Sequence, residues 1–121
     1  MNFNEYQAEA MRTAKVEEES QTSNLVHASP GLTTEVGEFV SEVKRMARYG
    51  KTLSPEMQAH MEEELGDILW YCALGAEALG VSLHSLAKAN IAKLQKRFPA
   101  SYSNEQAEAR ADKCGLGHQE S

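Results

Sequence analysis

The stretch YGKTLSPE, residues 49–56, decides the fold of this chain, because one helix ends and another begins within it. Gly50 occupies the position where helices commonly finish on a left-handed residue. Ser54, Pro55 and Glu56 have the order of an N-cap, an N1 proline and an acid in the first turn. The connection between the two helices is therefore about four to five residues long, which predicts an antiparallel helical hairpin.

Helical periodicity extends from this turn in both directions. Towards the N-terminus it predicts a helix that starts at Pro30 or Leu32 and runs to Tyr49. Towards the C-terminus it predicts a helix from Pro55 to about Leu79. The apolar residues expected to face inward are Leu32, Val36, Phe39, Val40, Val43 and Met46 on the first helix, and Met57, Met61, Leu65, Ile68, Leu69, Cys72 and Leu79 on the second.

Two more helices are predicted outside the hairpin. The first runs from about Phe3 to Glu19 and is followed by a polar loop over residues 20–29; the second is capped by Ser82 and runs to about Phe98. The polar tail that follows is expected to be weakly helical or disordered. These patterns predict an all-α fold, a four-helix bundle, with a helical domain over residues 1–99 and a tail over 100–121. Wide apolar stripes predict completion of the core in a homodimer or homotetramer.

Composition limits the partners of this 121-residue chain. Its formal charge of −6, from 18 acidic and 12 basic residues, argues against nucleic acid as the main partner. The longest apolar stretch, residues 68–76, is about half of what a membrane span needs, and no secretory signal is evident at the N-terminus. Cys72 and Cys114 are not expected to pair, so the interpretation is a cytoplasmic protein that does not bind membranes.

Two short phrases on the hairpin carry paired acids: EVGE at residues 35–38 and ELGD at residues 64–67. An i, i+3 spacing places both acids of a pair on one helix face, with Cβ atoms about 5–6 Å apart. Counting residues from the turn places the two pairs at heights that differ by only about 3 Å. Four carboxylates that converge repel one another unless a cation is bound, and oxygen ligands of this kind favour Mg²⁺, with Mn²⁺ as a substitute.

Each acidic phrase also contains a glycine, Gly37 in the first and Gly66 in the second. Glycine inside a helix costs about 0.5–1 kcal/mol relative to alanine. The pair therefore predicts that a neighbouring helix or a substrate approaches the backbone closely at these positions.

Two other interpretations of the acids compete with a magnesium site. In the first, they decorate the surface of a non-catalytic, helical, homo-oligomeric interaction module. In the second, they belong to a ferritin-like di-iron bundle, which requires Glu-x-x-His pairs. No histidine in this chain has an acid three positions before it, so the di-iron interpretation is disfavoured.

Taken together, these residues resemble the MazG-type all-α nucleoside triphosphate pyrophosphohydrolases, which carry an E-x-x-E pair on one helix and an E-x-x-D pair on the next. The similarity continues through residues 49–51, 63–71 and 90–99 and covers about Leu32 to Tyr102. Thr34 departs from the pattern, because the family often has a second glutamate there. This departure leaves the number of metal ions open.

The resemblance implies that the chain hydrolyses a nucleoside triphosphate to the monophosphate and pyrophosphate, with a role in cleaning the nucleotide pool. It implies that Glu35, Glu38, Glu64 and Asp67 hold Mg²⁺, and that Glu35 or Glu38 also orients the attacking water. The substrate stays open among deoxynucleotides such as dCTP or dUTP, modified nucleotides and phosphoribosyl-ATP.

The resemblance also suggests substrate-binding residues outside the acidic pairs. Tyr71, one turn after Asp67, would line the nucleotide pocket; the alternative is a tyrosine that packs between helices. Asn90, Lys93 and Arg97 form a polar line at i, i+3 and i+7 that could meet phosphate and sugar, although the two cations could also complement a helix C-terminus. Weaker candidates for substrate contact are the basic residues Lys44, Arg45, Arg48 and Lys51, together with His27.

Overall fold

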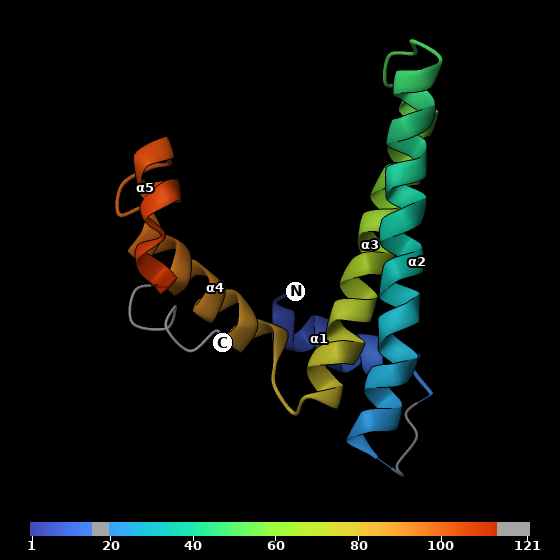
Figure 1. The fold of residues 1–121 in the computed structure, drawn as a ribbon. Coiled ribbons are helices and arrows are strands. Elements are labelled where there is room, and N and C mark those ends of the chain that lie inside the picture. The colour runs from blue at the N-terminus through green and yellow to red at the C-terminus, as the bar shows by residue number, and fades with distance from the viewer. Residues whose placement is uncertain (16–19, 114–121) are drawn as a thin grey trace. The chain divides into compact units, whose positions relative to one another are not determined.

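The computed structural model describes residues 1–15 and 20–113. In this part of the chain the regular structure is helical and no strand occurs, which confirms the all-α class (Figure 1). The chain divides into two compact units, Met1–Leu83 and the part that begins at His84. The helices are α1 (Phe3–Met11), α2 (Gln21–Arg48), α3 (Pro55–Ala78), α4 (Leu83–Arg97) and α5 (Asn104–Ala109), followed by a 3₁₀ turn over Ala111–Lys113.

Helices α2 and α3 form the predicted antiparallel hairpin and lie side by side along their length (Figure 1). Gly50 adopts the left-handed conformation, with φ of +59°. The Lys51 N–H donates to the carbonyl of Met46 at 3.0 Å, which closes the end of α2. Ser54 Oγ accepts the N–H of Met57 at 3.1 Å and caps α3. The local chemistry of this turn therefore fixes the direction of both helices, as the sequence predicts.

Helix α2 begins much earlier than expected. It starts at Gln21, so the prediction of a loop over residues 20–29 is wrong. Ser20 is the N-cap, and its Oγ accepts the N–H of Ser23 at 3.0 Å. Pro30 lies inside the helix, where proline costs about 3 kcal/mol. The added turns bury Ala28, so packing within the first unit opposes the local tendency of Pro30 to start a helix.

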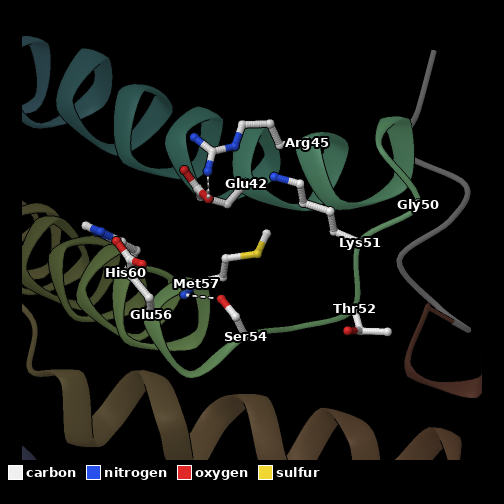
Figure 2. A pocket seen from close by; sticks show the side chains of 9 residues that line it. All are labelled: Glu42, Arg45, Gly50, Lys51, Thr52, Ser54, Glu56, Met57 and His60. Carbon is white, nitrogen blue, oxygen red and sulfur yellow. Dashed lines mark hydrogen bonds and ion pairs between the residues drawn. The ribbon is translucent and has the colours of Figure 1, made fainter.

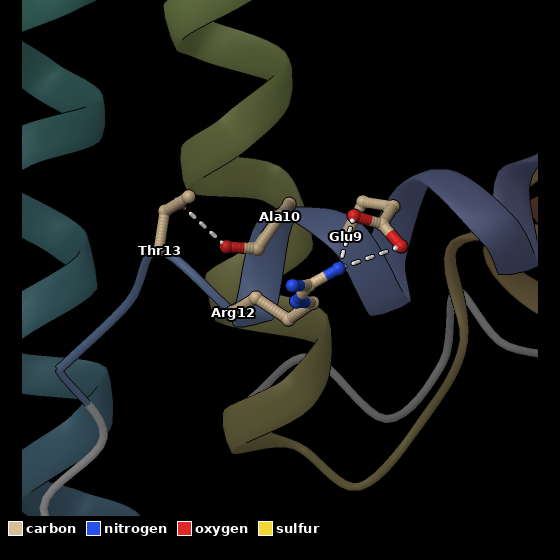
Figure 3. A network of polar contacts seen from close by, with 4 residues as sticks. All are labelled: Glu9, Ala10, Arg12 and Thr13. Atoms are coloured by element: carbon tan, nitrogen blue, oxygen red, sulfur yellow. Dashed lines mark hydrogen bonds and ion pairs between the residues drawn. The ribbon is translucent and has the colours of Figure 1, made fainter.

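Helix α1 ends sooner than expected, at Met11, and the prediction of helix over residues 12–15 is wrong. Residues 16–19, the rest of the predicted helix, lie outside the described part. The Thr13 hydroxyl donates to the carbonyl of Ala10 at 2.7 Å, and Arg12 pairs with Glu9 at 3.0 Å (Figure 3). A threonine that bonds a carbonyl of the preceding turn offers the backbone an alternative to a further helical turn.

The core of the first unit lies where α1 and the second half of α3 meet. Its buried residues are Ala10, Ala73, Ala76 and Leu83, with Tyr6, Met11, Leu69, Trp70 and Cys72 packed against them. Gln7 is buried among them: its Nε2 donates to Glu77 at 2.9 Å and to the Val81 carbonyl at 3.1 Å, and its Oε1 accepts the Leu83 N–H at 2.7 Å. A polar residue adds nothing to the apolar periodicity of a helix, so the sequence did not indicate that Gln7 is buried.

The predicted apolar stripe of α2 is partly wrong. Val36, Val40 and Val43 are 43%, 45% and 39% exposed, and on α3 Leu65 and Leu79 are each 52% exposed. Among the inward residues of α2, the half-buried Glu35 and Glu42 interrupt the apolar pattern. Periodicity identifies both helices, but it misses the first turns of α2 and misjudges the rotation of the helices, because acids take part of the face between them.

The second unit contains the rest of α4 and the segment after it. Helix α4 ends at Arg97, close to the predicted end. The expectation of weak helix or disorder after residue 100 is only partly right, since α5 and the 3₁₀ turn follow there; residues 114–121, including Cys114, lie outside the described part. Arg97 and Asp112 form an ion pair with nitrogen–oxygen distances of 2.6 and 2.9 Å, and the Asp112 side chain is only 1% exposed.

Candidate metal centre

Three of the four predicted acids converge on the hairpin. Glu35 from α2 and Glu64 and Asp67 from α3 each offer a carboxylate oxygen, and these oxygens all lie within 4.8 Å of one another. The counting argument that places the two pairs level across the hairpin is therefore correct. Glu38, the fourth acid, lies on α2 near enough to Glu64 that its negative charge raises the pKa of that carboxyl.

Burial and the neighbouring acids change the acidity of Glu64. Desolvation of its carboxylate raises the pKa of Glu64 to about 7, and hydrogen bonds and negative charge from Glu35 and Glu38 add to the rise. In addition, Oε2 of Glu64 is buried and lacks a hydrogen-bond partner within the described part of the chain. A buried carboxylate oxygen without a partner is costly.

The donor set at the cluster fits a hard divalent cation. Carboxylate oxygens are the ligands that Mg²⁺ and Ca²⁺ prefer, and a cation would satisfy the buried oxygen of Glu64. Positive charge at this point would also offset the negative charge of Glu35 and Glu38, which adds to the rise in the pKa of Glu64. Among the described acids, histidines and cysteines, Glu35, Glu64 and Asp67 form the group of three whose ligand atoms lie close enough together to hold a metal ion.

A pocket of about 750 Å³ opens between the helices near the hairpin turn (Figure 2). Arg45 of α2 and Lys51 of the turn line this pocket together with Glu56 and His60 of α3. Glu42 belongs to the same pocket and pairs with Arg45 at 3.8 Å. Because Glu42 follows Glu38 by four residues, the pocket begins about one helical turn, or roughly 6 Å, from the acidic cluster.

The other weak candidates lie elsewhere on α2. Lys44 and Arg48 line a shallow surface hollow with Tyr49. The guanidinium of Arg48 lies 5.8 Å from the centre of the Tyr49 ring, within the range of a cation–π contact. His27 is exposed and lines a separate pocket near the start of α2.

Tyr71 packs between the helices of the hairpin. Its ring lies against Gly31 of α2, so that a Cβ at Gly31 would overlap it, and it meets the edge of the Trp70 ring with centroids 4.9 Å apart. The position is one turn from Asp67. The packing role is therefore evident in the structure, while a contact with nucleotide stays a prediction.

The glycines of the acidic phrases do not serve helix packing. A Cβ added at Gly37 or Gly66 meets nothing within 4 Å in the described part of the chain, so the alternative in which a described helix approaches closely there is wrong, while close approach of a substrate stays a prediction. The close approach occurs instead at Gly31. Sequence reasoning missed this glycine, because the preceding proline indicated a helix start and removed Gly31 from the helix interior.

The remaining predicted substrate residues belong to the second unit. Asn90 and Lys93 are exposed on α4. Arg97 is engaged in its bidentate ion pair, and this bond raises the pKa of Arg97 and lowers that of Asp112. Nothing in the sequence indicated that Arg97 has a carboxylate partner 15 residues away.

Comparison with known families decides the classification. The model of the MazG nucleotide pyrophosphohydrolase domain matches residues 23–102, which is 80 of the 121 residues. The chain belongs to the MazG family. The matched region of this MazG chain includes the whole acidic cluster, all of the hairpin but the first two residues of α2, and α4, and it confirms the resemblance inferred from the motifs. Members of this family act on nucleotides and generally depend on a divalent metal, in keeping with the acidic cluster.

A relative of this MazG chain is the Gene 37 protein of Mycobacterium phage L5, which is 35% identical over 74 residues. The matched stretch covers 60% of this chain and 65% of the phage protein, so the chain spans just under two thirds of that relative's length. A search of solved structures gave no match. None of the described helices combines the length and the hydropathy that crossing a bilayer requires.

Proposed function

We propose that this chain hydrolyses a ribo- or deoxynucleoside triphosphate to the monophosphate and pyrophosphate with Mg²⁺ at the acidic cluster. The observation that carries the proposal is the convergence of Glu35, Glu64 and Asp67 within 4.8 Å in a chain of the MazG family. Hydrolysis adds one water molecule across the anhydride bond between the α- and β-phosphates.

The four acids bind the metal ion and orient the attacking water in this proposal. Glu64 and Asp67 hold Mg²⁺ from α3, and Glu35 and Glu38 hold it from α2. When bound, Mg²⁺ offsets the charge of the triphosphate and lowers the pKa of a coordinated water. Glu35 or Glu38 orients the attacking water and accepts its proton, as a carboxylate within hydrogen-bond reach can do.

Four further side chains are candidate substrate ligands in this proposal, Tyr71 in the first unit and Asn90, Lys93 and Arg97 in the second. Tyr71 lines the nucleotide pocket, and Asn90, Lys93 and Arg97 contact phosphate or sugar. Arg97 exchanges its carboxylate partner for phosphate, since a guanidinium fork fits both. The role for the cell is removal of unwanted nucleotides from the pool.

Assembly of two or four copies belongs to the same proposal. The exposed valines of α2, Val36, Val40 and Val43, form a stripe at i, i+4 and i+7 that a second copy would cover. Analytical ultracentrifugation tests the homodimer or homotetramer. A non-catalytic interaction module, the competing function, would assemble in the same way but release no pyrophosphate.

The experiment is a pyrophosphate-release screen of the full chain with Mg²⁺ against common and damaged nucleoside triphosphates. Activity on at least one of them is expected, and Glu38→Gln should abolish it while thermal unfolding stays close to wild type. Glu63→Gln is the matched control, because Glu63 is an exposed acid of α3 (77%) outside the cluster. Release from none of the nucleotides, or full activity of Glu38→Gln, would refute the proposal.

A further inference from the structure

Gly31 marks a close approach between the helices of the hairpin. A Cβ built on Gly31 would overlap the ring of Tyr71 and would stand 2.7 Å from Tyr71 Oη, whereas ordinary contacts of a Cβ begin at 3.4 Å. Only glycine lets the ring lie against α2 in this way. At Gly37 and Gly66, a Cβ would meet nothing within 4 Å in the described part of the chain.

This contact lies one helical turn from the acidic cluster on both helices. Gly31 precedes Glu35 by four residues and Tyr71 follows Asp67 by four, so each lies about 6 Å along its helix from an acid of the cluster. Because α2 and α3 run antiparallel, the two steps point the same way in space. The Gly31–Tyr71 contact and the Glu35–Asp67 pair therefore lie one helical turn apart on the same two helices. The distance between the helices at the contact thus constrains the distance between them at the acids.

The Tyr71 ring also contacts Trp70, which is in turn bonded to Thr13 in the segment after α1. Its edge contact with Trp70 is nearly perpendicular, with 87° between the rings. Trp70 Nε1 donates to Thr13 Oγ1 at 2.9 Å, and the Thr13 hydroxyl donates in turn to the Ala10 carbonyl (Figure 3). These contacts restrict the routes by which the ring could move away from an added methyl group. Part of the added volume would then be taken up by separation of α2 from α3.

We infer that Gly31 is a positioning residue of the metal centre: by seating Tyr71, it sets the helix separation at which the acids converge. The inference rests on the proposed function only in treating the acidic cluster as a divalent-metal site. Mg²⁺ requires oxygens at about 2.0–2.1 Å in nearly octahedral geometry, so a shift of several tenths of an ångström one turn away weakens its binding. Groups that orient metal ligands from outside typically contribute about 10–100-fold in affinity.

The test is Mg²⁺ binding to the full chain by isothermal titration calorimetry. Gly31→Ala is expected to bind Mg²⁺ about tenfold or more weakly than wild type, while Gly37→Ala, the matched control, binds it like wild type. Far-UV circular dichroism should report the same helix content in both. In Gly31→Ala/Tyr71→Leu the affinity should return to that of Tyr71→Leu alone, because the methyl group then has room.

Equal Mg²⁺ affinity of Gly31→Ala and wild type would overturn the inference. If Gly31→Ala does not fold, the double variant decides: an affinity equal to that of Tyr71→Leu supports the role, and a lost fold or lost affinity overturns it. If Gly31→Ala binds Mg²⁺ more weakly than wild type but wild type releases no pyrophosphate, the proposed activity is refuted and the positioning role stays intact. A wild type that binds no Mg²⁺ would overturn both.

Discussion

Replacing Pro30 by alanine is expected to stabilise the fold, because Pro30 lies inside α2. Proline in a helix interior lacks the N–H that bonds the carbonyl four residues earlier, and its ring crowds that carbonyl. Here the carbonyl belongs to Val26, whose residue is 65% exposed, so water can reach this part of the helix. From a full cost of about 3 kcal/mol, roughly 2 kcal/mol should therefore be recovered by Pro30→Ala.

The sign of this change distinguishes two helix starts. If the helix began at Pro30, proline would occupy N1, where it is favoured, and Pro30→Ala would be neutral or destabilising. Ser20→Ala supplies the second half of the comparison. Its Oγ caps α2 through the Ser23 N–H at 3.0 Å, so its loss should cost about 1 kcal/mol. In a loop the same substitution would stay within about 0.5 kcal/mol of wild type.

The assay is urea unfolding of both variants followed by far-UV circular dichroism, with thermal unfolding as a check. A gain of about 2 kcal/mol should raise Tm by roughly 6–10 °C for a chain of this length. A neutral or lower stability of Pro30→Ala, together with a neutral Ser20→Ala, would refute the helix from Gln21 and restore a loop before Pro30.

Gly37→Ala and Gly66→Ala should each stabilise the chain by about 0.5–1 kcal/mol in thermal unfolding, since the added methyl groups enter open space; lower stability would contradict that space. The pKa of Glu64 is 4.5 in the unfolded chain and about 7 in the metal-free fold. Relative to Glu64→Gln, wild type should therefore lose stability as pH rises from about 4.5 through 7. A difference in unfolding free energy between the two proteins that does not change with pH would refute the raised pKa of Glu64. Asp112 has a pKa below its usual 3.8 in the fold, so its contribution is present above pH 3.8 and is lost as pH falls through the folded value. Asp112→Asn should thus destabilise the chain at pH 7 and differ little from wild type in strong acid; an equal effect at both pH values would count against the ion pair.

Local chemistry made the centre of the fold predictable. Gly50, Ser54 and Pro55 fix the turn through backbone conformation and capping, which depend on neighbouring residues alone. The regular rise of a helix then places Glu35 opposite Asp67 by counting from the turn. The convergence of the acids could be anticipated because it depends on two helices joined by one short connection.

Tertiary packing decided what local rules missed. In the sequence, Pro30 indicates a helix start, but burial of Ala28 favours a longer α2. The contact of Gly31 with Tyr71 depends on the rotation of two helices, which periodicity did not give correctly for the valines of α2. The partner of Arg97 lies 15 residues away in a segment without periodic signal, so the ion pair could not be predicted.

Thermal unfolding in the presence of increasing Mg²⁺ tests most directly whether the hairpin acids hold a divalent cation. A ligand that binds only the folded chain raises Tm with its concentration. Wild type should show this rise at millimolar Mg²⁺, and Glu35→Gln/Asp67→Asn should not. A wild-type Tm that does not respond to Mg²⁺, or a double variant that responds equally, would contradict the account.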